Sequence, residues 1–124
     1  MNARRKLLIV DDDEAVVDYL RAKLGGYYDI VSTNAPQKVL DIARKDRPNL
    51  ILCDVDMPGM DGGDVSKELY ADSELRGIPV LFVTALMTAS DMKNTDNQIG
   101  GRPAISKQAA PHELEKRIAA LIQA

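Results

Sequence analysis

The stretch that decides the fold is Leu50-Ile51-Leu52-Cys53-Asp54-Val55-Asp56-Met57-Pro58-Gly59-Met60-Asp61-Gly62. Its first four residues are apolar and predict a buried strand, with Asp54 standing where that strand ends. The proline and glycines that follow predict a turn-rich loop. A carboxylate is costly to bury unless it is paired or binds a metal. The stretch therefore predicts a functional carboxylate, Asp54, delivered to a loop by a core strand.

A second acidic cluster follows another apolar run. Leu7-Leu8-Ile9-Val10 leads directly into Asp11-Asp12-Asp13. Two strands that end in carboxylates can bring them to one edge of a sheet, where three oxygen ligands favour a hard divalent cation such as Mg²⁺. An alternative role for Asp12 or Asp13 is to cap a helix that begins near Glu14, because aspartate is a favoured N-cap residue.

The rest of the chain alternates between strand and helix patterns. Strands are predicted at residues 7–10, 28–32, 50–53, 80–83 and 104–106. Helical periodicity is seen at residues 16–24, 36–43, 65–71 and 114–122. Asn34 is predicted to cap the second helix and Gly25-Gly26 to stop the first, whereas residues 88–101 predict only a short or frayed helix.

This alternation predicts an α/β domain with a doubly wound parallel sheet and helices on both faces. The three strongest strand runs show no polar alternation, as expected for strands covered on both sides. Crossovers in such sheets are right-handed, and ligands bind outside the carboxyl ends of the strands. Four polar side chains fall at or just after predicted strand ends, and these are Asp11, Asp12, Asp54 and Thr84. Their coincidence predicts one site.

Composition excludes several classes of protein. The 124 residues suit one domain, with 45% hydrophobic and 28% charged residues. The single cysteine excludes an intrachain disulfide and fits a reducing compartment. No apolar run approaches the ~20 residues that span a membrane, and the run after the basic N-terminus is too short for a secretory signal. The net charge of −3 argues against direct nucleic-acid binding.

In the order and combination of its motifs, the chain resembles a response-regulator receiver domain of two-component signalling over essentially its full length. The motifs are Ile9-Val10-Asp11-Asp12-Asp13, the stretch 54–62, Val83-Thr84-Ala85, and Lys107 four residues before Pro111-His112-Glu113-Leu114. The resemblance implies a flavodoxin-like, five-stranded sheet of order 2-1-3-4-5. It also implies that residues 1–124 form a single receiver domain without an output domain, whether alone or as a module of a longer chain.

The resemblance assigns roles by position. Asp54 matches the aspartate that takes a phosphoryl group from a phosphohistidine. Asp11 and Asp12 match the acidic pair that holds Mg²⁺ (or Mn²⁺) with Asp54, and the backbone carbonyl of Asp56 matches a further ligand.

Two further positions complete the implied site. Thr84 matches a hydroxyl that reorients toward the phosphoryl oxygens, and Lys107 matches the lysine that pairs with them. The implied protein is a cytoplasmic signalling switch rather than an enzyme. Its implied partners are a histidine kinase or phosphotransfer protein and an unknown downstream protein. A monomer or weak dimer is expected, with neither membrane nor nucleic acid as a partner.

Two positions depart from the family pattern. Gln108 follows Lys107 where proline is usual, so the Lys107–Gln108 bond is expected to be trans, since a non-proline cis bond costs about 2.5–4 kcal/mol. Ala104 stands where many members carry an aromatic switch residue. The usual coupled motion of threonine and aromatic ring is therefore not expected here.

Two other functions remain open at this stage. The departures at Ala104 and Gln108 suggest a degenerate receiver that only binds proteins. Asp54-Val55-Asp56 also resembles the nucleophile motif of haloacid-dehalogenase-type Mg²⁺ phosphohydrolases, although there it follows the first strand and here the third. The kinase, the pathway, the output partner and the phosphoryl lifetime are not encoded in any motif.

Overall fold

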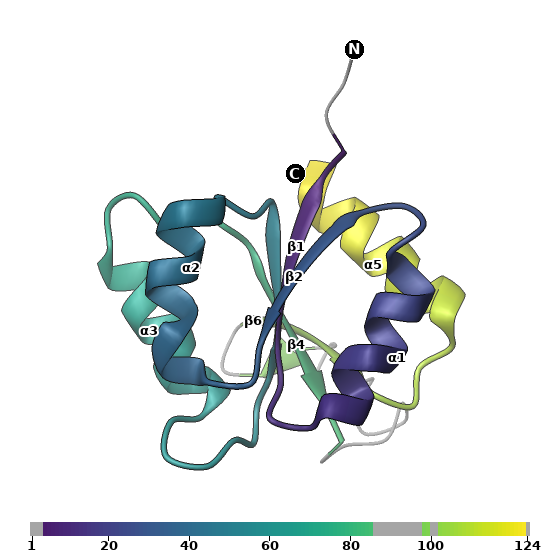
Figure 1. The fold of residues 1–124 in the computed structure, drawn as a ribbon, viewed down its shortest axis with the longest axis horizontal. Coiled ribbons are helices and arrows are strands. Elements are labelled where there is room, and N and C mark those ends of the chain that lie inside the picture. Colours follow the sequence, from purple (N-terminus) through teal and green to yellow (C-terminus); the bar gives the residue numbers. More distant parts are fainter. Residues whose placement is uncertain (1–3, 86–97, 100–101, 124) are drawn as a thin grey trace.

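The computed structural model describes residues 4–85, 98–99 and 102–123 (Figure 1). The strands are β1 (Lys6–Val10), β2 (Asp29–Thr33), β3 (Leu50–Asp54), β4 (Val80–Thr84), β5 (Gln98–Ile99) and β6 (Arg102–Ser106). The helices are α1 (Glu14–Leu24), the 3-10 helix η1 (Pro36–Lys38), α2 (Val39–Asp46), α3 (Gly62–Ala71) and α5 (Pro111–Gln123). The predicted alternation of strand and helix is confirmed.

The sheet has the order β2-β1-β3-β4-β6-β5. Its first five strands are parallel neighbours, which confirms the predicted 2-1-3-4-5 arrangement with β6 as the fifth strand. The predicted number of strands was wrong by one, because β5 adds a two-residue antiparallel partner to β6. So short a strand has no apolar run that could mark it. The helix expected within residues 88–101 lies outside the described residues, apart from Gln98 and Ile99 in β5.

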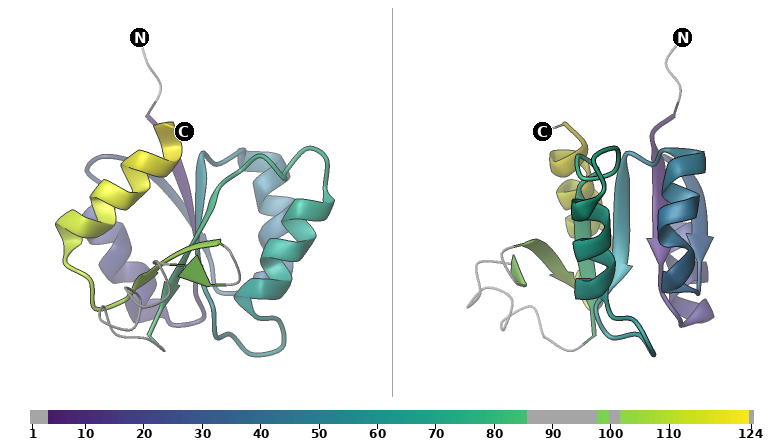
Figure 2. Two further views of the ribbon diagram at one scale, coloured as in Figure 1. Left: turned by 180° about the vertical axis from the view of Figure 1, so that it is seen from behind. Right: turned by 90° about the vertical axis from the view of Figure 1, so that its left-hand side faces the viewer.

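The sheet is the middle of three layers. Helices α1 and α5 cover one face, and α2 and α3 cover the other (Figures 1 and 2). Successive side chains of each central strand enter opposite cores, so that Leu7 and Ile9 pack toward α1 and α5 while Leu8 and Val10 pack toward α2 and α3. All of β3 and β4 is buried. Burial on both faces explains why these strands are apolar throughout.

The helix ends agree with the sequence at some positions and not at others. Asp13 caps α1 by accepting a hydrogen bond from the Ala15 amide, and α1 ends at Gly25 as predicted. The prediction for Asn34 was wrong, because η1 begins without a side-chain cap and the side-chain amide of Asn34 donates to the Asp11 backbone carbonyl instead. Helix α3 begins with a capping box formed with Asp61, which the sequence analysis missed.

Among residues 4–85, 98–99 and 102–123, no helix has the length and apolar character needed to cross a membrane.

Candidate functional site

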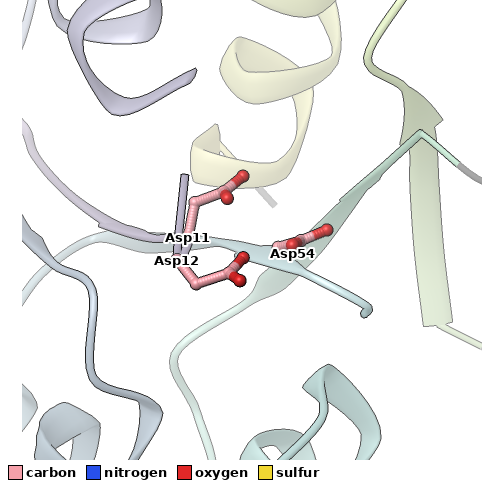
Figure 3. Close-up of side chains that lie close together, drawn as sticks. All are labelled: Asp11, Asp12 and Asp54. Atoms are coloured by element: carbon pink, nitrogen blue, oxygen red, sulfur yellow. The ribbon is translucent and has the colours of Figure 1, made fainter. Parts of the chain in front are cut away.

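Three aspartates meet at the carboxyl ends of two neighbouring strands. Asp54 is the last residue of β3, and Asp11 directly follows β1, whose Val10 pairs with Cys53. The three side chains cluster there, as Figure 3 shows, and each of Asp11, Asp12 and Asp54 offers an oxygen within 4.8 Å of the others. The structure therefore brings together the acidic residues that the sequence predicted.

The backbone and its neighbours hold Asp11 in place. Its backbone amide donates to the Thr33 carbonyl at 3.3 Å, and its own backbone carbonyl accepts from Asn34 Nδ2 at 2.9 Å. Its Oδ1 accepts from the Asp13 amide at 2.9 Å. Asp13 is thus used as a helix cap, while Asp12 is exposed and its carboxylate faces the other two acidic groups. The capping role considered for this cluster therefore falls to Asp13, and the Asp12 carboxylate is left beside those of Asp11 and Asp54.

Lys107 enters the same pocket from the chain after β6. Its Nζ lies 2.8 Å from Asp11 Oδ2 and 3.4 Å from Asp54 Oδ1. Its amide donates to the Thr84 carbonyl at 2.8 Å, which ties it to the end of β4. Burial by itself lowers the Lys107 pKa, but the hydrogen bond and charge of Asp11, reinforced by Asp54, raise that pKa above its ordinary value. The ammonium therefore stays protonated at neutral pH.

The Asp54 carboxylate is destabilised by its surroundings. Burial raises its pKa and the nearby charge of Asp11 raises it further, while Lys107 and a hydrogen bond from the Asp56 amide oppose the shift. Among the residues that the structure describes, the carboxyl groups of Asp11, Asp12 and Asp54 gather around one ammonium, that of Lys107. An oxygen-only donor set with excess negative charge fits a small hard cation.

Thr84 and Asp56 also lie where the sequence placed them. Thr84 is fully buried and ends β4, beside the Val83 that pairs with Asp54. Asp56 is an exposed loop residue two positions beyond the end of β3. The structure therefore gathers all six predicted site residues around the ends of β1, β3, β4 and β6.

Gly62 is a supporting residue that the sequence analysis missed. It begins α3, and its amide donates to the Val55 carbonyl at 2.9 Å, closing the loop after Asp54. A Cβ at this position would lie 2.6 Å from the Asp54 carbonyl oxygen and 3.1 Å from a ring carbon of Phe82. Only glycine lets the helix approach the strand end this closely. Its sequence signals are its place at the end of the family motif 54–62 and its position directly after a potential N-cap aspartate.

The two departures from the family pattern have clear structural settings. The Lys107–Gln108 bond is trans, as expected. Ala104 is fully buried in β6 and pairs with Phe82 of β4. The aromatic ring at this level of the sheet therefore comes from β4.

Cys53 is expected to resist thiol reagents in the native protein. The side chain is fully buried, and burial followed by the charge of Asp54 raises its pKa to about 12. The thiolate, which is the form that attacks such reagents, is therefore scarce at neutral pH. Mass spectrometry after iodoacetamide treatment should show alkylation only once urea unfolds the chain. Fast alkylation without denaturant would contradict this burial.

Comparison with known proteins assigns the family. Residues 7–119 match the family described as the response regulator receiver domain, and the chain belongs to that family. The chain is similar to the "Probable transcriptional regulator ycf27" of Pyropia yezoensis, with 34% identity over 98% of this chain and 49% of the relative. It is also similar to the "Response regulator PleD" of Caulobacter vibrioides, with 46% identity over 69% of this chain and 19% of the relative.

Solved structures agree with this assignment. A putative response regulator from Chloroflexus aurantiacus has a TM-score of 0.84 and 28% identity, covering 98% of this chain and 100% of its own. A receiver domain of a Pseudomonas aeruginosa sensor histidine kinase shares the fold, with a TM-score of 0.82 and 21% identity, covering 98% of this chain and 100% of its own. The chain spans about half the length of the ycf27 regulators that it matches.

Family membership defines the class of function. Receiver domains are phosphoacceptor signalling switches that act with histidine kinases or phosphotransfer proteins, and they are not classical enzymes. Neither the phosphohydrolase nor the degenerate binding module is favoured by these relatives. The membership also accounts for the acidic cluster, because receivers use such a site for a divalent cation.

Proposed function

We propose that residues 1–124 form a single receiver domain whose Asp54 accepts a phosphoryl group from a histidine kinase or phosphotransfer protein in the cytoplasm. The domain acts as a switch for a downstream protein and turns over no substrate of its own. The observation that carries the proposal is the bridge from Lys107 Nζ to Asp11 and Asp54, 2.8 and 3.4 Å away, at the carboxyl edge of the sheet. It joins a buried nucleophile, an acidic partner and a fixed cation in one place.

The proposed metal ligands are the side chains of Asp11, Asp12 and Asp54 and the backbone carbonyl of Asp56. The donor set supports Mg²⁺, because the three carboxylate oxygens lie within 4.8 Å of one another. The neighbour from Pseudomonas aeruginosa is described with a magnesium ion coordinated in its active-site cleft. When bound, Mg²⁺ offsets the negative charge shared by the carboxylate and the incoming phosphoryl oxygens.

Transfer needs alignment more than it needs a strong base. The Asp54 carboxylate attacks phosphorus, the P–N bond to the donor histidine breaks, and the leaving ring nitrogen takes up a proton. Lys107 lies 3.4 Å from the nucleophile and places a second positive charge beside the phosphoryl group. The Thr84 hydroxyl is proposed to turn toward that group once it is attached. The added charge of about −1.5 to −2 then biases the loops at this edge of the sheet.

Backbone amide NMR tests the switch directly. Spectra are recorded for the free protein, after addition of Mg²⁺, and after further addition of beryllofluoride, a phosphoryl mimic. We expect Mg²⁺ to change the chemical shifts of amides around Asp11 and Asp54. We expect beryllofluoride to extend these changes to Thr84 and into β6. A spectrum that neither addition changes would favour a degenerate binding module instead.

Mg²⁺ is expected to stabilise the protein through this pocket. A ligand that binds only the folded state adds about 2.7 kcal/mol to the free energy of unfolding when its free concentration is a hundred times its Kd. The melting temperature should therefore rise with Mg²⁺ concentration, and Asp11→Asn should remove most of this rise. The rise should also shrink as the pH falls, because Asp54 has a raised pKa and its protonation competes with the cation.

Asp18→Asn is the matched control for the Mg²⁺ experiment. Asp18 is exposed on α1 and is not part of the acidic cluster. This variant should keep the full dependence of the melting temperature on Mg²⁺. An equal loss in Asp11→Asn and Asp18→Asn would mean that the stabilisation arises from general screening of a negatively charged protein.

A further inference from the structure

Ser106 anchors the turn after β6 in which Lys107 lies. Ser106 is the last residue of β6, pairs with Thr84 of β4, and is only 4% exposed. Its hydroxyl oxygen accepts a hydrogen bond from the Gln108 amide at 3.1 Å. Its carbonyl oxygen accepts a second one from the Ala109 amide at 3.0 Å. Of the three backbone amides that follow Ser106, those of Gln108 and Ala109 therefore donate hydrogen bonds to it.

These bonds define a four-residue turn, Ser106 to Ala109, with Lys107 at its second position. Serine is favoured at the first position of such turns because its hydroxyl can accept from the amide two residues on. The Lys107 amide donates across to the Thr84 carbonyl at 2.8 Å. The backbone is thus held immediately before and immediately after the Lys107 Cα.

The direction of the Lys107 side chain follows from this anchoring. A lysine stem is flexible and loses rotamer freedom when its ammonium is held at one point. Because the backbone is fixed on both sides of Lys107, only the side-chain torsions of the lysine stem remain free to vary. Its Nζ then reaches Asp11 at 2.8 Å and Asp54 at 3.4 Å while the side chain is only 18% exposed.

We propose that Ser106 is a positioning residue for phosphoryl transfer, whose hydroxyl holds the Lys107–Gln108 turn and so aims the Lys107 ammonium at Asp54. The inference rests on the proposed phosphoacceptor function. Ser106 touches neither carboxylate through any contact that the described structure records, so its effect passes through Lys107. Flexibility of the lysine stem makes the expected effect moderate rather than complete.

The first test compares phosphorylation rates with phosphoramidate, a small phosphoryl donor, and Mg²⁺. Ser106→Ala is expected to slow labelling by about fivefold, the effect of losing one hydrogen bond of ordinary strength. Ser106→Thr keeps a hydroxyl and should restore most of the rate. Ser73→Ala, an exposed serine in the loop after α3, should label at the wild-type rate. A wild-type rate in Ser106→Ala would overturn the inference.

A double-mutant cycle separates this role from general packing. Gln108→Pro removes the amide hydrogen that Ser106 accepts, because proline has no N–H. In that background Ser106→Ala should cost nothing further, and the coupling between the two changes should equal the loss seen in Ser106→Ala alone. The same fivefold loss in both backgrounds would overturn the inference. If Gln108→Pro does not fold, the threonine variant and the exchange measurement below decide.

Amide hydrogen exchange in the metal-free protein gives a readout that does not depend on phosphorylation. The Gln108 and Ala109 amides should be protected in the wild type, and Ser106→Ala should speed exchange at Gln108 more than at Ala109. Equal exchange of Gln108 in the two proteins would contradict the turn. A wild-type protein that takes no label at all refutes the phosphoacceptor function, whereas labelling that ignores Ser106 refutes only this inference.

Discussion

Asp54→Asn is expected to abolish phosphoryl incorporation from a phosphohistidine or small-molecule donor, a loss of at least about a thousandfold. An asparagine amide fills the same space but is a poor nucleophile and carries no negative charge for a cation. The carboxylate it replaces lies 3.4 Å from Lys107 Nζ and within 4.8 Å of the other cluster oxygens. The protein is incubated with the phosphoryl donor and Mg²⁺. Intact mass spectrometry then measures the fraction of protein that has gained one phosphoryl group.

Loss of folding is not expected to explain that result. The pKa of Asp54 is higher in the folded protein than in the unfolded chain. Ionisation of Asp54 therefore lowers the free energy of unfolding as the pH rises through the folded-state pKa. Replacing it with a neutral amide removes this penalty, so the metal-free variant should melt no lower than the wild type at neutral pH. Asp18→Asn serves as the control and should label normally. Retained labelling of Asp54→Asn would place the phosphoacceptor elsewhere.

Gly62→Ala is expected to destabilise the domain by about 1–3 kcal/mol, in the range of other overpacked sites. The added methyl would lie 2.6 Å from the Asp54 carbonyl oxygen and 3.0 Å from the Val55 Cα. Both are backbone atoms, so either the loop or the start of α3 must move. Urea unfolding followed by circular dichroism measures the loss, and the labelling assay should show a slower rate because Asp54 is displaced.

Gly77 and Gly59 provide comparison variants for the destabilisation expected in Gly62→Ala. At Gly77 a Cβ would meet nothing within 4 Å, so Gly77→Ala should change the free energy of unfolding by less than about 1 kcal/mol. Gly59 has a φ of 80°, so Gly59→Ala should destabilise through backbone strain rather than contact. A Gly62→Ala protein as stable as Gly77→Ala would mean that α3 does not approach the strand end this closely.

The sequence patterns predicted the alternation of strands and helices and the acidic cluster, and the family resemblance predicted the strand order 2-1-3-4-5. Runs such as 7–10 and 50–53 are apolar on both faces, as expected for strands inside a covered parallel sheet. Aspartates directly after two such runs then lie at the same edge, since parallel strands share the position of their carboxyl ends, and they meet there because β1 and β3 are neighbours. The family motifs added Thr84 and Lys107 at the same edge, although neither would stand out by its residue type alone.

Other features depended on contacts between residues far apart in the chain. Asn34 was expected to cap a helix but donates to the Asp11 carbonyl, because β1 and β2 end side by side. The need for glycine at position 62 arises from how closely α3 approaches β3. The direction of the Lys107 side chain depends on the pairing of β6 with β4 and on the turn that Ser106 anchors. Local sequence patterns record periodicity and turn chemistry, whereas close approaches of this kind exist only after the layers have packed.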